Sequence, residues 1–443
     1  MKDQISGHTR RMVLAGSAAL GVSLAVLTEP GKAAAGAASG SDAVRPFRVT
    51  VPEEQLADLR RRIAMIRWPD RETVADESQG VQLATMRELT RYWASDYDWR
   101  KCEARLNALP QFMTGIDGLD IHFIHVRSKH EHALPLVVTH GWPGSVIEQL
   151  KIIDPLTNPT AHGADASDAF HLVIPSLPGY GFSARPTTTG WGPERTARAC
   201  AVLMKRLGYA QFVAQGGDLG AGVCTAMAKQ AHPELLGIHT NFPGAIPPDI
   251  AKALQAGDPP APDLPADERH ACEQLAVLFA KRRAYSAMQG TRPQTLYGLA
   301  DSPVSLAAWL LDHPDGYGQP AAAISSAVLG RTINGHPAGS ITRDDVLDDI
   351  TLYWLTNTGI SAARFYWESH FNLYNAADVS IPAAVSIFPG ENYQAPRSWV
   401  ERAYHKLIYF NTVHRGGHFA AWEQPKLFSE EVRAGFRPLR KSI

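Results

Sequence analysis

Short apolar runs alternate with stretches of helical periodicity through the middle of the chain. Four runs have the length and composition of buried strands, at residues 134–139, 170–175, 212–214 and 235–240. Helical patterns lie between them, at residues 196–207 and in a segment that ends near Ala231. Strands that alternate with helices are typical of a parallel sheet covered by helices on both faces. The pattern therefore predicts an α/β fold.

The alternation is preceded and interrupted by other patterns. Before it, Leu56, Leu59 and Ile63 have helical spacing. It stops near Gly244, where a mainly helical, aromatic-rich stretch begins, and strand-like runs resume later, at residues 383–388 and 407–413. We therefore expect a helical cap inserted into the sheet domain. The predicted parts are a leading segment at 45–130, the first part of the core at 131–244, the cap at 245–377 and the second part of the core at 378–443.

The N-terminus has the pattern of an export signal. Arg10 and Arg11 precede a mostly apolar stretch at residues 12–27, and Lys32 and a run of small residues follow it. A basic start, a short apolar run and small residues favour a cleaved signal over a membrane span, and the paired arginines resemble a twin-arginine signal. We expect a signal at residues 1–37, a linker at 38–44 and an exported protein. The other interpretation is a single, weakly hydrophobic anchor helix.

Composition and charge exclude several classes of partner. The chain has 443 residues, 45% of them hydrophobic, and a formal net charge of −1. That balance predicts a globular protein that does not bind nucleic acid or an acidic membrane surface. The four cysteines lie far apart, without the spacing of metal ligands, so we expect separate structural thiols, no metal and no cofactor. Folding before twin-arginine export agrees with reduced thiols.

One glycine-rich turn carries a reactive side chain. Asp218 lies in residues 216–221 (GGDLGA), between a predicted strand and a predicted helix. Small neighbours allow the sharp turn that holds a nucleophile at the sheet edge of α/β-hydrolases, where esterases have serine. A carboxylate in this place can displace a leaving group from an sp³ carbon and form an ester. The alternative is an ordinary turn in which Asp218 caps the helix.

A second motif predicts an oxyanion hole. Residues 140–143 (HGWP) end an earlier strand. In this fold that loop supplies one main-chain N–H, and the residue after the nucleophile supplies the other. The expected donors are therefore the main-chain N–H groups of Trp142 and Leu219. For the Trp142 indole, simple packing is the favoured interpretation.

The base and its acidic partner are expected after the cap. His418 lies in residues 415–420 (RGGHFA), after a strand-like run, and the order Asp, cap, His is the one that this fold uses. Glu391 ends another strand-like run, in residues 388–391 (FPGE), and is the natural candidate to orient His418. Asp378 is a weaker candidate because it precedes that run.

Taken together, the motifs resemble the microsomal-type epoxide hydrolases. The similarity lies in residues 140–145 (HGWPGS), 178–183 (PGYGFS), 217–220 (GDLG) and 415–420 (RGGHFA). The leading segment is similar to their N-terminal domain, notably at residues 97–100 (YDWR) and 118–123 (GLDIHF). The resemblance covers residue 45 to the C-terminus and implies an α/β-hydrolase fold with an N-terminal extension.

The resemblance also implies a reaction. Members of that family open an epoxide with an aspartate, hydrolyse the resulting ester to a vicinal diol, and hold the epoxide oxygen with two tyrosines. Tyr285 and Tyr366 match the two tyrosine positions, and Glu391 matches the acid position, where other members carry Asp. Composition alone does not choose among the tyrosines of the cap, which include Tyr285, Tyr297, Tyr317, Tyr353, Tyr366 and Tyr374.

The implied partner is a small, apolar epoxide, and the oligomeric state stays open. Eukaryotic relatives begin with a membrane anchor, whereas this chain has a signal-like start, so we do not expect membrane association once the signal is removed.

Two other functions remain possible for the chain. A haloalkane dehalogenase shares the aspartate and histidine but holds halide with indole N–H groups, which Trp142 could supply. A non-catalytic ligand-binding relative of the fold would be expected to lack Asp218 or His418, and both are present.

Overall fold

The computed structural model describes residues 42–312, 326–328, 332–333, 336–337, 339–370 and 374–440. The expected signal at residues 1–37, part of the linker, and Tyr317 lie outside these residues. Residues 39–443 fall into one compact unit. Its main sheet contains β1 (Arg45–Pro46), β2 (Gln111–Ile116), β3 (Leu119–Val126), β4 (Leu134–Thr139), β5 (Phe170–Pro175), β6 (Phe212–Gly216), β7 (Leu235–Thr240), β10 (Val379–Ile387) and β11 (Tyr404–Thr412).

The sheet is antiparallel at one end and parallel over the rest. Its strand order is β1-β2-β3-β5-β4-β6-β7-β10-β11. The pairs from β1 to β5 through β2 and β3 are antiparallel, and every pair from β5 to β11 is parallel. The four central parallel strands, β4 to β7, are short and almost wholly buried, as expected when helices cover both faces. This is the α/β arrangement that the pattern predicted, in the form of the α/β-hydrolase fold that the family resemblance implied.

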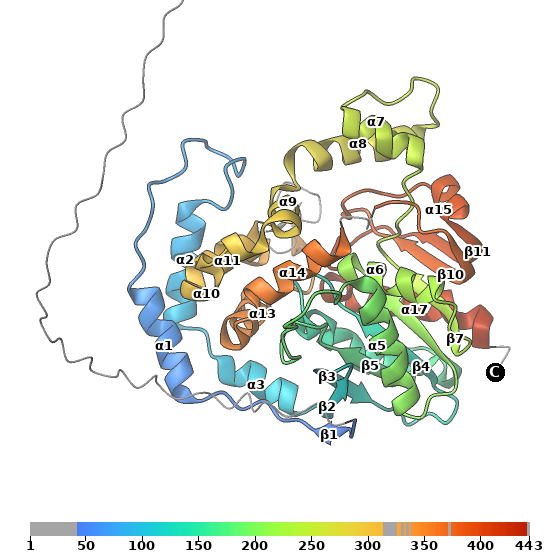
Figure 1. Cartoon of the computed structure of the whole chain (residues 1–443), viewed down its shortest axis with the longest axis horizontal. Coiled ribbons are helices and arrows are strands. Elements are labelled where there is room, and N and C mark those ends of the chain that lie inside the picture. The colour runs from blue at the N-terminus through green and yellow to red at the C-terminus, as the bar shows by residue number, and fades with distance from the viewer. Residues whose placement is uncertain are drawn as a thin grey trace, which may run out of the picture. The chain divides into compact units, whose positions relative to one another are not determined.

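Helices cover the sheet in two layers (Figure 1). On one face α5 packs on α6; on the other, α17 packs against α4 and the neighbouring η1. The elements outside the cap are α1 (Glu53–Ala64), α2 (Leu83–Ser95), α3 (Trp99–Asn107), η1 (Val146–Ile152), α4 (Ile153–Thr157), η2 (Pro159–His162), η3 (Ala166–Asp168), α5 (Pro193–Arg206), α6 (Asp218–Lys229), α15 (Arg397–Ala403), α16 (Ala420–Glu423) and α17 (Pro425–Arg440).

The predicted elements of the core are confirmed, with small shifts of their ends. The third strand continues to Gly216, two residues beyond the expected end, because its main chain pairs on both sides with β4 and β7. The leading segment is not wholly helical, since β1 before its helices and β2 and β3 after them join the main sheet. Leu56, Leu59 and Ile63 are buried on one side of α1, as their spacing predicted.

The cap leaves the sheet after β7 and returns before β10. The two ends of this insertion are joined to each other, because Ile246 pairs with Asn375 and the amide of Ala377 donates to the carbonyl of Gly244 over 2.8 Å. We call these paired ends the stem. The cap elements are α7 (Pro248–Ala256), α8 (Ala266–Lys281), α9 (Ala284–Thr291), η4 (Pro293–Thr295), α10 (Gly298–Asp301), α11 (Pro303–Leu311), β8 (Thr332–Ile333), β9 (His336–Pro337), α13 (Arg343–Thr356) and α14 (Gly359–Ser369).

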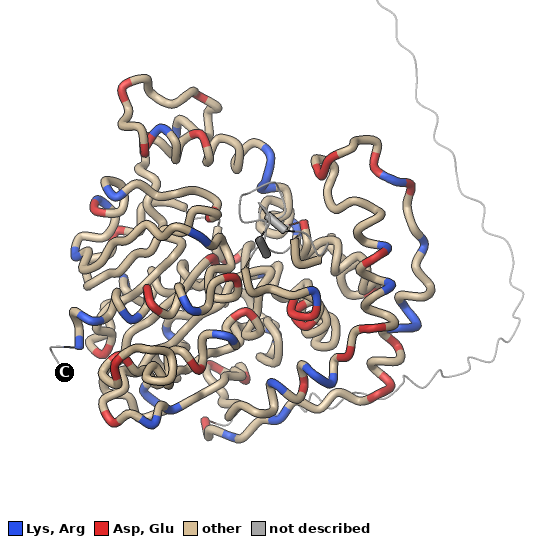
Figure 2. The backbone as a smooth tube through the Cα atoms, turned by 180° about the vertical axis from the view of Figure 1, so that it is seen from behind, with Lys and Arg blue, Asp and Glu red and all other residues tan. Residues whose placement is uncertain are grey.

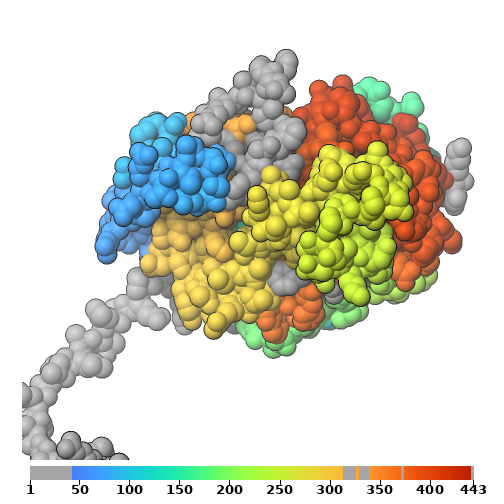
Figure 3. Space-filling view, turned by 90° about the horizontal axis from the view of Figure 1, so that it is seen from above, coloured from blue at the N-terminus to red at the C-terminus, as the bar shows by residue number. Residues whose placement is uncertain are grey.

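The leading helices hold the cap through α13. The Trp93 indole donates to the Thr351 hydroxyl over 2.9 Å, and the Tyr97 hydroxyl donates to the Asp348 carboxylate over 2.6 Å. Arg105 forms an ion pair with the same carboxylate. Figure 3 shows the N-terminal helices, in blue, lying directly against the golden part of the cap.

The same helix α13 also holds the HGWP loop. The Tyr353 hydroxyl donates to the carbonyl of Gly144 over 2.9 Å, and the Ser145 hydroxyl donates to Asp349 over 2.5 Å. The leading helices, α13 and the loop of Trp142 therefore form one connected unit.

Charged residues are spread along the backbone, with both signs interspersed (Figure 2). Within the described part of the chain, no helix is long and apolar enough to cross a membrane. The same residues contain no group of three or more His, Cys, Asp or Glu side chains that could hold a metal ion.

Candidate active site

Asp218 lies in a tight turn at the carboxyl end of β6. It is the first residue of α6 and has a φ of 46°, which is unusual for a residue with a side chain. Gly141 and Gly220 make the turn possible, because a Cβ at Gly141 would overlap Asp218 and one at Gly220 would overlap the main chain of Thr139. The predicted nucleophile elbow is therefore present, and such a strained position at a pocket is typical of a functional residue.

The main-chain N–H of Trp142 is directed at this side chain. It donates to Asp218 Oδ1 over 2.8 Å, in a buried setting. Leu219 follows Asp218 in the first turn of α6, where N–H groups have no partner within the helix. The two predicted oxyanion donors therefore belong to segments that meet at Asp218.

His418 lies between two carboxylates. Its Nδ1 is 2.5 Å from Glu391 Oε1, and its Nε2 is 3.5 Å from Asp218 Oδ2. The loops after β10 and β11 meet because Gly390 pairs with Gly417. The structure therefore brings Glu391, and not Asp378, to His418. Asp378 is exposed and contacts His405 over 2.8 Å.

The two carboxylates determine the charge of His418. Burial by itself lowers the pKa of this imidazole, but the Glu391 and Asp218 carboxylates outweigh it and hold the pKa well above its usual value. The imidazolium is therefore the stable form while both carboxylates are charged. Loss of one negative charge would lower the pKa of His418 and make it a better base.

Two cap tyrosines lie over Trp142. The Tyr285 ring stacks on the indole, with centroids 4.9 Å apart, and the Tyr366 ring meets it edge-on at 5.8 Å. Burial raises the pKa of both phenols well above the usual value, so both remain protonated at neutral pH. The Tyr366 hydroxyl is buried without a well-oriented hydrogen-bond partner in the described part of the chain. Both tyrosines can therefore donate a proton to a ligand.

The other cap tyrosines are differently placed. Tyr297 is exposed, and the Tyr353 hydroxyl is used by the carbonyl of Gly144. The Tyr374 hydroxyl accepts a hydrogen bond from the Asn392 side-chain amide over 3.4 Å, and the Tyr374 ring meets the Phe242 ring edge-on. The packing of the Trp142 indole against Tyr285 and Tyr366 agrees with the favoured interpretation of that side chain.

Sequence reasoning missed Glu148. This residue lies in η1, and only 8% of its surface is exposed. Burial raises its pKa to about 8, and the nearby Asp349 and Asp218 carboxylates add to the effect. One signal was available in the sequence, since Glu148 interrupts an otherwise apolar start of a helix just after the HGWP motif.

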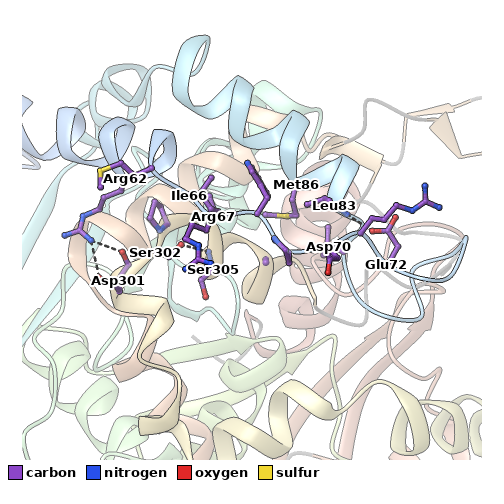
Figure 4. Close-up of a pocket in the computed structure, with 18 of the residues that line it drawn as sticks. Arg62, Ile66, Arg67, Asp70, Glu72, Leu83, Met86, Asp301, Ser302 and Ser305 are labelled. Atoms are coloured by element: carbon purple, nitrogen blue, oxygen red, sulfur yellow. Dashed lines mark hydrogen bonds and ion pairs between the residues drawn. The ribbon is translucent and has the colours of Figure 1, made fainter.

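A large cavity lies away from these residues. It has a volume of about 920 Å³ and is formed by α1, the loop before α2, α10 and the start of α11. Figure 4 shows Arg62 reaching Asp301 at its edge, and the Arg62 guanidinium donates to the Asp301 carbonyl over 2.8 Å. None of the predicted catalytic residues lines it, so its size does not make it the reaction site.

Comparisons with known proteins agree with the geometry. The family model for the epoxide hydrolase N terminus matches residues 44–149, and that for the alpha/beta hydrolase fold matches residues 135–256. A "Putative epoxide hydrolase" of Stigmatella aurantiaca is 49% identical over 90% of this chain and 86% of its own length. Epoxide hydrolase 1 of Sus scrofa is 33% identical over 90% and 89%.

Solved structures give the same result. The juvenile hormone epoxide hydrolase of Bombyx mori has a TM-score of 0.78 at 30% identity, covering 91% of this chain and 96% of its own. The Aspergillus niger epoxide hydrolase has a TM-score of 0.74 at 30% identity, covering 90% and 97%. With the aspartate elbow, the buried histidine and the tyrosine pair in place, this chain belongs to the microsomal-type epoxide hydrolase family.

Proposed function

We propose that this chain converts an epoxide and water to a vicinal diol through an ester on Asp218. The observation that carries the proposal is the position of Asp218, whose Oδ1 accepts from the Trp142 N–H while its Oδ2 faces His418. The two tyrosines packed against Trp142 supply the acid on the cap side. Nucleophile, base and acid are thus assembled around one carboxylate.

In the first step Asp218 attacks a ring carbon of the epoxide. A carbon–oxygen bond forms to the carboxylate, and the ring carbon–oxygen bond breaks. Tyr285 or Tyr366 donates its proton to the leaving oxygen, and the other phenol stabilises the charge by a hydrogen bond. The product is an ester between Asp218 and the opened substrate, with one tyrosine left as phenolate.

In the second step His418 activates water. Ester formation cancels the charge of Asp218, which is one of the two charges that raise the pKa of His418. The imidazolium then returns its proton to the phenolate, and the neutral imidazole, held by Glu391, takes a proton from water. Hydroxide adds to the ester carbonyl, and the Trp142 and Leu219 N–H groups stabilise the oxyanion. Collapse breaks the ester bond, and the leaving alkoxide takes the proton of the added hydroxyl. The diol leaves, Asp218 is restored as a carboxylate, and His418 is again an imidazolium.

The site favours an apolar substrate. Its cap side is formed by the aromatic rings of Trp142, Tyr285 and Tyr366, and Phe242 packs edge-on against His418 at 5.5 Å between centroids. These surfaces contact hydrocarbon well and offer polar groups only at the epoxide oxygen.

A single turnover in ¹⁸O-water tests the proposal. Because water attacks the ester carbonyl, the label should enter Asp218 and be absent from the first diol. His418→Gln should trap the ester, seen as an added substrate mass on the peptide that holds Asp218. His405→Gln is the matched control, since His405 lies on the surface against Asp378. Label in the first diol, with no trapped ester, would make Asp218 a general base instead.

We also propose that the chain is exported through a twin-arginine-like signal. Arg10 and Arg11 before the apolar stretch support this, as do four cysteines that are all buried and unpaired. Replacing both arginines with lysine should leave the protein in the cytoplasm, measured by cell fractionation. Unchanged export of that variant would contradict the proposal.

A further inference from the structure

A second, small cavity lies on the core side of the catalytic residues. Its volume is about 20 Å³, which is enough for one water molecule and too small for a substrate. Asp218 and His418 line it, and so does Glu148, whereas no residue of the cap does. It is therefore separate from the face where Tyr285 and Tyr366 meet the epoxide. We call it the core-side cavity.

Two residues that line the core-side cavity carry a polar group without a partner. Gln149 and Gln215 line it, and the carbonyl oxygen of each side-chain amide is buried without a hydrogen-bond partner in the described part of the chain. Each amide nitrogen is already used, by Glu148 over 2.6 Å and by Asn241 over 3.1 Å. Buried acceptors left in this way need a donor, and a water molecule is a donor of the right size.

The buried carboxyl of Glu148 completes this wall. Its Oε1 accepts from Gln149, and its Oε2 lies where a Cβ on Gly144 would be. Only a glycine at position 144 therefore leaves room for this carboxyl. Burial raises the pKa of Glu148 to about 8, Asp349 from α13 and Asp218 from α6 add to this rise, and His418 partly opposes it, so Glu148 is protonated at neutral pH. A protonated carboxyl can both donate to water and accept from it.

We propose that the core-side cavity binds the hydrolytic water and that Glu148 is the residue that positions it. Water held there lies beside both Asp218 and His418, because both residues line the cavity and no residue of the cap does. Glu148 does not touch the epoxide, so it acts only in the second step. The inference rests on the proposed ester mechanism and adds a water site to it.

Glu148→Leu tests the positioning role. Leucine fills a similar volume but cannot hold water, so hydrolysis of the ester should slow by roughly 10- to 100-fold while alkylation of Asp218 keeps its rate. Slower hydrolysis with unchanged alkylation lowers kcat and KM together and leaves kcat/KM unchanged. Rapid-quench measurement of the ester separates the two steps. Equal slowing of both steps, or no slowing of hydrolysis, would overturn the proposal.

Glu148→Gln provides the conservative rescue. Glutamine keeps a donor and an acceptor, so hydrolysis should return to within a few-fold of the wild-type rate. It also cannot ionise. We expect hydrolysis by wild type to decline as Glu148 loses its proton above about pH 8, and we expect this decline to be absent from Glu148→Gln. Failure of glutamine to restore hydrolysis over leucine would contradict the role given to Glu148.

A matched control separates positioning from damage to the loop. Ser145→Ala removes the hydroxyl that caps η1 and binds Asp349, but Ser145 does not line the core-side cavity. It should lower stability without changing the ratio of alkylation to hydrolysis. If wild type forms no ester at all, the proposed function fails. If the ester forms and Glu148→Leu hydrolyses it normally, only the water site fails.

Discussion

Trp142 serves the site through two different groups. Its main-chain N–H holds Asp218 Oδ1, and its indole supports Tyr285 and Tyr366. One residue thus links the oxyanion hole in the core to the proton donors in the cap. A change in the side chain would disturb the tyrosines, while a change in the loop backbone would disturb the nucleophile.

The catalytic role of the Tyr285 and Tyr366 hydroxyls can be tested separately from the packing of their rings. Tyr285→Phe and Tyr366→Phe keep the rings on Trp142 and remove only the hydroxyls, so alkylation of Asp218 should slow by roughly 10²- to 10³-fold while ester hydrolysis changes little. Rapid-quench kinetics measures both steps. Tyr393→Phe is the control, because that buried hydroxyl donates to the carbonyl of Pro243. Full activity in both single variants would remove the tyrosines from the mechanism.

The site residues differ in how far the sequence could predict them. Asp218 and His418 stand in glycine-rich turns after strands, where local pattern and chemistry coincide. Tyr285 and Tyr366 were identified only through a family resemblance, because the packing of α9 against α14 is a long-range contact that no local spacing encodes. Glu148 was missed since a single acidic residue in a helix ordinarily faces solvent.

Among the elements, α13 connects the leading helices to the loop of Trp142. It receives Trp93, Tyr97 and Arg105 from the leading helices and in turn holds Gly144 and Ser145. The leading helices therefore support the site without touching it. The sequence predicted α1 from its apolar spacing, but it did not predict this role, which depends on polar contacts between residues about 250 positions apart.

Tyr92 in α2 and Tyr97 in the turn after it allow a matched test of how the leading helices support α13. Tyr97 donates to the buried Asp348, whereas Tyr92 donates to Asp344 over 2.7 Å in a partly exposed place. Tyr97→Phe should lower the free energy of unfolding by roughly 1.5–3 kcal/mol and Tyr92→Phe by about 0.5–1.5 kcal/mol, because a buried charged acceptor is left less satisfied. Urea unfolding measures both. Equal losses would argue that burial of Asp348 is unimportant.

Over the whole molecule, buried carboxyls make stability depend on pH. Burial raises the pKa of Asp349 from 3.8 to about 8. The folded state then binds a proton more tightly than the unfolded state, so this contribution is complete below about pH 4 and is lost as pH rises through 8. At neutral pH the buried side chain of Asp349 is therefore the neutral carboxylic acid and not the carboxylate.

Asp349→Asn should therefore weaken the pH dependence. The asparagine keeps an acceptor for Ser145 and cannot ionise, so the fall in Tm between pH 5 and pH 9 should be smaller than in wild type by about 2 °C or more. Differential scanning calorimetry measures the two values. Asp301→Asn is the surface control, with a side chain that is 89% exposed, and should leave the fall unchanged. An unchanged fall in Asp349→Asn would contradict the burial argument.

The stem has a consequence for how such a protein can diversify. Because Ile246 pairs with Asn375, the cap departs from the sheet and returns to it at a single point. The more than one hundred residues between these two ends therefore connect β7 to β10 with the end-to-end geometry of a short turn. Within the insertion, α13 holds Gly144 and Ser145, and α9 and α14 carry the two tyrosines. Changes elsewhere in the insertion therefore cost little in the geometry of Asp218 and Glu391. New preferences for substrate can be inherited through those other parts, while the reaction itself is passed on unchanged.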